Sequence, residues 1–192
     1  MNLKNYFQES SDLIKNLYLF DKQLNMIADC IYTVYKKNKK VLVAGNGGSS
    51  ADADHFVGEL VCTFKDPKRN PVSAISLSCH PAALTAWSND FGFDSYFERQ
   101  VKAHGVNGDI LILLSTGGGS LETGASMSLV KAANEALKRN MTVISFIGKS
   151  GGELKKISNI SIHIPNENTA LIQEAHMALL HCICVLLETK LS

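Results

Sequence analysis

The sequence lacks an excess of charge of either sign. Its 192 residues carry 19 Lys and Arg against 18 Asp and Glu, which gives a formal net charge of +1. Proteins that bind nucleic acid usually carry a strongly basic surface, and this balance predicts none. Recognition of an anion such as phosphate must therefore depend on local backbone N–H groups and hydroxyl side chains. We expect no nucleic-acid partner.

The sequence also has no C-x-x-C pair, and its number of cysteines is odd. This pattern argues against a disulfide framework and favours reduced thiols. Most of the cysteines lie in apolar segments, which predicts that they are buried and unreactive. They are Cys30, Cys62, Cys79, Cys182 and Cys184.

Long apolar runs are missing as well. The apolar stretch 178–187 is too short to span a bilayer, and the polar stretch 1–12 does not have the pattern of a secretory signal. We therefore expect a cytoplasmic protein with no membrane partner. The length and the 45% share of hydrophobic residues fit a single globular domain.

From residue 40 onward, short apolar runs alternate with helical patterns. Such alternation predicts an α/β fold in which helices cover both faces of a parallel sheet. The predicted strands are 40–44, 72–77, 109–115, 141–147 and 160–164, and the predicted helices are 49–62, 81–87, 127–139 and 169–189.

The first 37 residues have a helical period instead. Apolar residues recur three and four positions apart, which predicts one long helix or two helices end to end. This seam must be buried in the core of the chain or against the same helix of another subunit, and its length favours the second alternative. We therefore divide the single domain into an N-terminal helical oligomerisation segment, 1–37, and an α/β core, 38–192. The apolar residues are Leu13, Leu17, Phe20, Leu24, Ile27, Ile31 and Val34.

Two nucleotide-binding fingerprints are absent, although glycine-rich loops are present. Ser50 stands where a dinucleotide fingerprint in the loop 45–50 needs glycine, and Val143 stands where a P-loop ending at Ser150 needs glycine. The loops 45–50 and 115–120 each follow a predicted strand, where parallel sheets bind ligands. Their small residues and hydroxyls predict a phosphate or sugar site, and ordinary strand-to-helix turns with a capping serine are the alternative.

Two helices carry residues capable of chemistry. His55 and Glu59 share a face of the predicted helix 49–62, so they can bind a divalent metal or place a base beside a ligand; a solvent-facing pair is the alternative. The last predicted helix carries His176 and His181 in an apolar surrounding, where a histidine needs a partner. A structural role is sufficient for His176, and His181 is the better functional candidate.

The residues Asn89 and Asp90 form a polar pair in a predicted turn between apolar neighbours. They can bind sugar hydroxyls, and an Asx-turn or a helix cap is the alternative.

Together these motifs resemble those of the phosphoheptose isomerases, which belong to the sugar isomerase (SIS) domain family. The resemblance covers most of the chain and implies a three-layer α/β sandwich with a five-stranded parallel sheet between helices. It also implies a homotetramer with active sites formed between subunits. The motifs are GNGGS at 45–49 with Asp52, His55-Phe56 and Glu59, NDFG at 89–92, Ser115-Thr116, and IQEAH at 172–176 with His181.

The resemblance further implies one zinc ion per subunit and proton transfer by Glu59 and His181. Aldose–ketose isomerisation moves a proton between C1 and C2 through an enediol, with Glu59 expected as the base at carbon and His181 as the acid and base at oxygen. A carboxylate held on zinc is a weaker base, so the two roles of Glu59 conflict unless one is transient. The implied zinc ligands are His55, Glu59, Gln173 and His181. The implied substrate-binding residues are Asn46, Gly47, Gly48, Ser49, Glu59, Asn89, Asp90, Ser115, Thr116, Gly117, Ser120 and Gln173.

Three features depart from the family pattern. Gly117 replaces a serine, 121–126 is an insertion beside the same loop, and Leu171 replaces an arginine. They affect phosphate contacts and substrate identity but leave the acid–base pair intact.

The leading hypothesis is isomerisation of sedoheptulose 7-phosphate to D-glycero-D-manno-heptose 7-phosphate, for the synthesis of nucleotide-activated heptose and surface polysaccharide. One alternative is isomerisation of another sugar phosphate. The other is a non-catalytic SIS-domain protein that binds a replication initiator. The presence of Glu59 and His181 argues against this last alternative, although a fold alone does not fix function.

Overall fold

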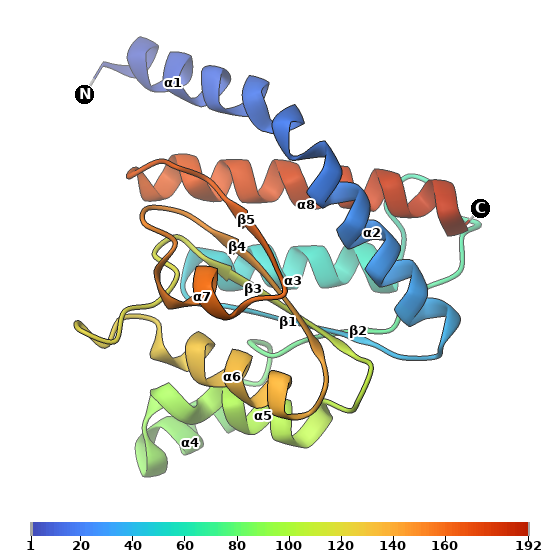
Figure 1. The fold of residues 1–192 in the computed structure, drawn as a ribbon, viewed down its shortest axis with the longest axis vertical. Coiled ribbons are helices and arrows are strands. Elements are labelled where there is room, and N and C mark those ends of the chain that lie inside the picture. The colour runs from blue at the N-terminus through green and yellow to red at the C-terminus, as the bar shows by residue number, and fades with distance from the viewer. Residues whose placement is uncertain (1, 192) are drawn as a thin grey trace.

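The computed structural model of the chain describes residues 2–191. Its centre is one sheet with the strand order β2-β1-β3-β4-β5, and every neighbouring pair is parallel (Figure 1). The five predicted strands and their parallel arrangement are confirmed. The strands are β1 (Val41–Gly45), β2 (Ala74–Ser76), β3 (Ile110–Ser115), β4 (Thr142–Ile147) and β5 (Ile160–His163).

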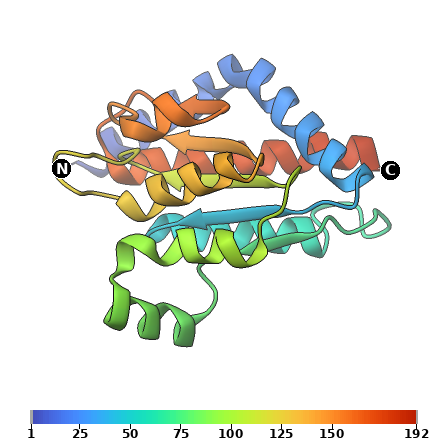
Figure 2. The ribbon, with the colours of Figure 1, turned by 60° about the horizontal axis from the view of Figure 1, so that its bottom comes forward.

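Helices cover both faces of the sheet, so the architecture is a three-layer α/β sandwich (Figures 1 and 2). Alternate residues of each strand face opposite layers; in β3, Ile112 packs toward one layer and Leu113 toward the other. The first layer contains α2 (Asp21–Lys36), α3 (Gly48–Val61) and α8 (Thr169–Leu191). The second contains α5 (Tyr96–His104), α6 (Met127–Lys138) and α7 (Gly152–Ile157), with α4 (Pro81–Phe91) and the 3-10 turn η2 (Phe93–Ser95) at its margin.

The N-terminal segment forms two helices end to end, the second of the two predicted alternatives. Helix α1 (Leu3–Lys15) is followed by the 3-10 turn η1 (Asn16–Phe20) and then by α2. Helix α2 buries the second half of the predicted seam against α8 of the same chain, whereas α1 has no buried residue and projects from the body (Figure 1). Core packing within this chain therefore accounts for part of the seam that we assigned to contacts between subunits.

Helix α8 is long and apolar enough to cross a membrane by length and composition. The helix is longer than the apolar stretch 178–187 that the sequence singled out. Half of the most hydrophobic window of α8 is buried, and the helix packs against α1, α2 and α3. Helix α8 thus packs as one of the core helices of the fold.

Two expectations from the sequence were wrong in detail. The cysteines are free as predicted, but Cys62, Cys79 and Cys182 are exposed and only Cys184 is buried. Apolar sequence neighbours did not ensure burial, because these thiols lie at the end of a helix, in a loop and on the outer side of α8. In addition, α4 extends to Phe91, so that Asn89 and Asp90 lie in its last turn rather than in a separate turn.

Candidate active site

The sheet changes direction of winding between β1 and β3. After β1 the chain adds β2 on one side, and it then returns to place β3 on the other side of β1. The loops that follow these two strands therefore diverge and leave a crevice at the carboxyl edge of the sheet. They are the two glycine-rich loops that the sequence singled out.

A cavity of about 300 Å³ lies between these loops and the start of α8. It brings together most of the predicted substrate-binding residues, which come from three distant parts of the chain. The lining residues are Asn46, Gly47, Gly48, Ser49, Leu114, Ser115, Thr116, Ser126, Thr169 and Gln173.

The first turn of α3 forms one wall of the cavity. The helix begins at Gly48, and the N–H groups of a first helical turn, together with the helix dipole, favour an anion. A side chain at position 48 would displace Gln173, because a Cβ atom there would lie 2.5 Å from Gln173 Nε2. The glycine thus allows Gln173 to approach the helix start.

Asn46 offers an unused acceptor in this wall. Its Nδ2 atom donates a hydrogen bond of 3.2 Å to Ser128 Oγ, while its Oδ1 atom is buried and has no partner among residues 2–191. A buried acceptor without a donor is costly. A hydroxyl group of a ligand would satisfy it.

The loop after β3 is held rigidly. Gly118 N donates to Ser115 Oγ at 2.9 Å, and the first turn of α7 donates to the carbonyls of Gly118 and Gly119. Ser115 and Thr116 line the cavity, but Ser120 does not; its Oγ accepts from Thr123 N at 3.2 Å. The predicted role of Ser120 in substrate binding therefore stays a prediction.

The predicted chemical residues meet farther along α3 and α8, which run side by side in the same direction. His55 Nε2 lies 3.2 Å from His181 Nε2 and 3.1 Å from Glu59 Oε1. We expected Glu59 and His181 to converge from different chains. The structure instead links them through His55 within one chain.

The three facing atoms cannot all be satisfied by one proton. His55 Nε2 carries at most one hydrogen, yet it faces both an imidazole nitrogen and a carboxylate oxygen. A cation between them would satisfy all three. Tetrahedral zinc bonds of about 2.0–2.1 Å place neighbouring ligand atoms only slightly more than 3 Å apart, and the two distances from His55 Nε2 are close to this spacing.

The fourth implied zinc ligand is not with the other three. Gln173 lies beside Gly48, and it makes no hydrogen bond to His55, Glu59 or His181 in the described chain. Residues 2–191 contain no group of three or more His, Cys, Asp or Glu side chains that could hold a metal ion as they stand, so zinc binding would require these side chains to move.

Asn89 and Asp90 lie outside the cavity. They are exposed at the end of α4, where Asn89 Nδ2 donates to Asp90 Oδ1 at 2.9 Å. Helix α4 has no buried residue and hangs below the sandwich in Figure 2. Within one chain, these two residues therefore do not join the predicted site.

His176 is a buried residue of the core. Burial lowers its pKa to about 4, only partly offset by the backbone of Ile147, so the imidazole is neutral at physiological pH. Neither ring nitrogen has a partner of full hydrogen-bond geometry in the described chain, and the ring packs edge-on against Phe146. These features agree with a structural role.

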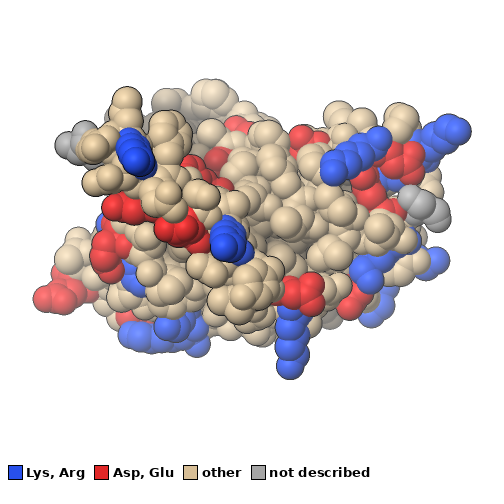
Figure 3. All heavy atoms as spheres, turned by 90° about the horizontal axis from the view of Figure 1, so that it is seen from above, with Lys and Arg blue, Asp and Glu red and all other residues tan. Residues whose placement is uncertain are grey.

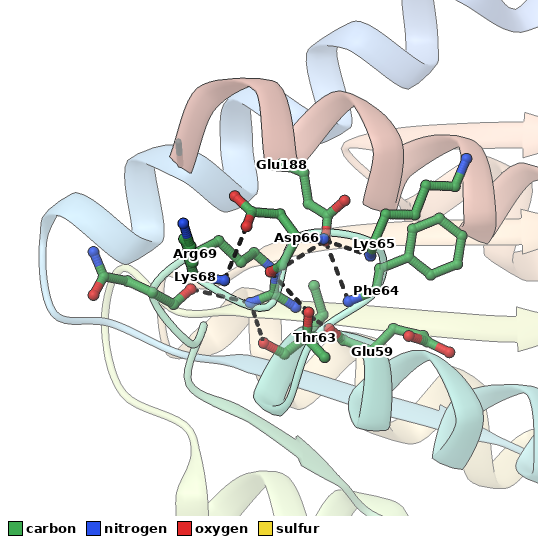
Figure 4. Close-up of polar contacts among 10 residues, drawn as sticks. Glu59, Thr63, Phe64, Lys65, Asp66, Lys68, Arg69 and Glu188 are labelled. Carbon is green, nitrogen blue, oxygen red and sulfur yellow. Dashed lines mark hydrogen bonds and ion pairs between the residues drawn. The ribbon is translucent and has the colours of Figure 1, made fainter.

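The sequence did not indicate three residues that lie close to the group formed by His55, Glu59 and His181. The Phe64 ring stacks on His181, and Glu188 and Arg69 fold the loop that carries Phe64 (Figure 4). Glu188 gave one signal, because it is a charged residue directly after the apolar run 183–187. Arg69 gave none, because it lies in the polar segment 65–71.

Comparisons with known proteins agree with this picture. Residues 5–148 match the SIS domain family. A phosphoheptose isomerase from Aquifex aeolicus is 37% identical over 187 residues, 97% of this chain and 94% of that protein. One from Citrifermentans bemidjiense is 39% identical over 161 residues, 84% and 80% of the two chains. The solved structure of a phosphoheptose isomerase from Francisella tularensis has a TM-score of 0.89 at 32% identity and covers 97% and 96% of the two chains.

Proposed function

Because the chain belongs to the phosphoheptose isomerases of the SIS domain family, we propose that it converts sedoheptulose 7-phosphate to D-glycero-D-manno-heptose 7-phosphate. The observation that carries this proposal is the convergence of Glu59, His55 and His181 beside the glycine-loop cavity. The product is suited to the synthesis of nucleotide-activated heptose for surface polysaccharide.

The cavity supports binding of the phosphate end of the sugar. The first turn of α3 and the hydroxyls of Ser115 and Thr116 supply neutral donors, in keeping with the low net charge of the chain. His55 lies seven residues beyond Gly48, which corresponds to about 10 Å along a helix. An open sugar chain with a terminal phosphate can bridge this length and bring its first two carbons to the acid–base group.

The acid–base group supports proton transfer through an enediol. Glu59 removes the proton from carbon and returns it to the neighbouring carbon, while His181 exchanges the proton at oxygen. His55 contacts both residues and fixes their orientation. The substrate therefore needs only to place its C1 and C2 beside Glu59.

We further propose one zinc ion per subunit. His55 and His181 would hold it after a rearrangement of their side chains, and Glu59 would bind it only while not acting as the base. Gln173 is the implied fourth ligand, after its side chain turns away from Gly48. A bound zinc ion would polarise the sugar carbonyl.

A homotetramer with shared sites is the assembly that we propose for this cytoplasmic enzyme. The face formed by α1, α2 and α8 has a broad area without charged side chains between charged clusters at its two ends (Figure 3). A groove of about 460 Å³ on these helices includes the exposed Tyr18 and Val185. In such an assembly, Asn89 and Asp90 would reach the cavity of a neighbouring subunit.

Deuterium exchange tests the reaction. Purified protein supplied with zinc is incubated with sedoheptulose 7-phosphate in heavy water, and product and carbon-bound deuterium are followed by NMR. We expect both in the wild type and neither in Glu59→Gln. Absence of product and exchange in the wild type would exclude the proposed reaction. Turnover that persists in Glu59→Gln and His181→Ala would exclude the assigned roles.

Isomerisation of another sugar phosphate is the second candidate function. Gly117 and the insertion 121–126, which lie beside the cavity loop, favour it. Turnover of a different ketose phosphate alone would support it. If the protein turns over no sugar phosphate, binding of a protein partner becomes the next function to test.

A further inference from the structure

The loop that follows α3 is folded around one carboxylate. Glu188 Oε1 accepts hydrogen bonds from the backbone N–H groups of Phe64, Lys65 and Asp66, at 3.2, 2.9 and 3.1 Å (Figure 4). Glu188 is only 8% exposed. A buried carboxylate that accepts three main-chain hydrogen bonds fixes the path of that segment strongly.

Arg69 connects this loop to the helix that carries Glu59. Its guanidinium donates to the carbonyl oxygens of Glu59 and Leu60 in the last turn of α3, and its Nε atom lies 3.4 Å from Glu188 Oε1. The last carbonyls of a helix have no partner within the helix, so a buried cation there holds the helix end in place. The Arg69 side chain is 2% exposed.

The other side of the same loop contacts His181. The ring of Phe64 stacks on the imidazole with a centroid distance of 5.4 Å and an interplanar angle of 24°. Glu188 lies seven residues, or two turns, beyond His181 on α8. Helix α8 therefore presents the imidazole and also supplies the carboxylate that folds Phe64 over it.

From these contacts we propose that Glu188 and Arg69 are positioning residues for the acid–base pair: Glu188 folds residues 64–66 so that Phe64 holds the His181 ring, and Arg69 fixes the turn of α3 that carries Glu59. Neither residue touches the substrate. The proposal rests on the proposed isomerase function for its kinetic consequences, but the contact between Phe64 and His181 can be measured without any substrate.

The experiment compares Glu188→Gln and Phe64→Leu with the wild type in the full-length, zinc-supplied protein. Histidines carry ¹³C at Cε1, and the His181 signal is assigned by its absence in His181→Gln. We expect both variants to shift the His181 signal, because the ring current of Phe64 is lost or displaced. We also expect kcat to fall about tenfold or more. KM should stay within a factor of about two, because the phosphate end binds at the distant glycine loops.

Asp109→Asn is the matched control. Asp109 is fully buried and binds Lys40 Nζ at 2.7 Å and the backbone N–H groups of Lys40 and Val106 at 3.0 and 2.9 Å. It has the same chemistry as Glu188, but its side chain binds Lys40 and Val106 rather than the loop after α3. We expect Asp109→Asn to lower stability without shifting the His181 signal or changing kcat of the folded protein.

Two results would overturn the proposal. One is a Glu188→Gln variant that behaves like Asp109→Asn, and the other is a Phe64→Leu variant with an unchanged His181 signal and kcat. Should Glu188→Gln fail to fold, Phe64→Leu decides alone, because it leaves the contacts of Glu188 in place. Should the wild type turn over no sugar phosphate, the proposed function fails and the His181 signal decides this inference by itself.

Discussion

Gly48 and Gln173 are fitted to each other: a Cβ atom on Gly48 would lie 2.5 Å from Gln173 Nε2. The contact joins the first turn of α3 to the first turns of α8, and both helix starts line the cavity at the carboxyl edge of the sheet. Because Gly48 has no side chain, the Gln173 amide has room to lie against the start of α3.

The first prediction uses this contact. Gly48→Ala should displace the Gln173 side chain and raise KM for the sugar phosphate about tenfold or more. The fold should persist, because alanine favours a helix over glycine by about 1 kcal/mol. Steady-state kinetics and urea unfolding measure both effects. Gly58→Ala is the control in the same helix: its Cβ would meet no atom within 4 Å, so stability should rise and KM should not change. An unchanged KM in Gly48→Ala would show that the Gln173 position is irrelevant.

The second prediction concerns zinc. Calorimetric titration of metal-free protein should show one zinc ion per subunit. His55→Gln and His181→Gln should each weaken binding at least about a hundredfold, because each removes one of the few N and O ligands that zinc requires.

Gln173→Ala serves as the comparison in the same titration. If Gln173 stays beside Gly48, this variant should bind zinc nearly as the wild type does; a loss as large as that of His181→Gln would show that Gln173 turns to the metal. Wild-type protein that takes up no zinc would remove the metal from the proposal.

Local sequence patterns predicted the sheet well, because its central strands β1, β3 and β4 are buried on both faces and therefore appear in the sequence as continuous apolar runs. The predicted strand 109–115 and the observed β3, Ile110–Ser115, differ by one residue. Since parallel strands end at one edge, the loops 45–50 and 115–120 could also be placed together. Helical spacing alone placed His55 and Glu59 on one face of a helix, and the family resemblance supplied their chemical roles.

Other features depend on contacts that no local pattern contains. Arg69 and Glu188 lie far apart in the sequence and meet only after α3 and α8 have packed. The prediction that Asn89 and Asp90 lie in a turn was wrong, because α4 continues to Phe91. The helix ends only at Gly92, whose φ is +86°. The sequence favoured burial of the apolar seam against another subunit and left burial in the core open; the structure buries the α2 part of the seam against α8 of the same chain.

The third prediction concerns stability and pH. Burial alone raises the pKa of Glu188, but the hydrogen bonds from Asp66, Lys65 and Phe64 and the charge of Arg69 outweigh it and lower the pKa below the ordinary value of 4.5. A carboxyl with a lowered pKa in the folded state stabilises the fold above its unfolded pKa. This contribution is lost as the pH falls through the folded pKa.

Urea unfolding at pH 7 and at several values below pH 4.5 measures this contribution. At pH 7, Glu188→Gln should lower the free energy of unfolding by about 3 kcal/mol, because it leaves the buried Arg69 without its charge partner. The difference between wild type and variant should shrink below pH 4.5. A difference that stays constant from pH 7 to pH 3 would contradict a charge-dependent role for Glu188.

The fourth prediction restores the hydroxyl that the chain lacks at Gly117. Open space surrounds this position: a Cβ atom there would meet nothing within 4 Å, and φ is not in the left-handed region. Gly117→Ser should therefore leave the melting temperature unchanged and add a donor next to Thr116 at the cavity. One further hydrogen bond to a charged phosphate contributes about 1.5–3 kcal/mol, so KM for sedoheptulose 7-phosphate should fall about tenfold.

Gly118→Ser is the contrasting variant, because its Cβ would lie 1.9 Å from the Gly151 carbonyl oxygen and its φ is +71°. Gly118→Ser should unfold at a clearly lower temperature, because its Cβ atom would clash with a carbonyl oxygen of the loop that leads into α7. If Gly117→Ser instead raises KM, or lowers it equally for a sugar without phosphate, then the loop after β3 does not bind the phosphate group. In that case the first turn of α3 would have to bind it alone, and the glycine at position 117 would reflect the shape of a different substrate.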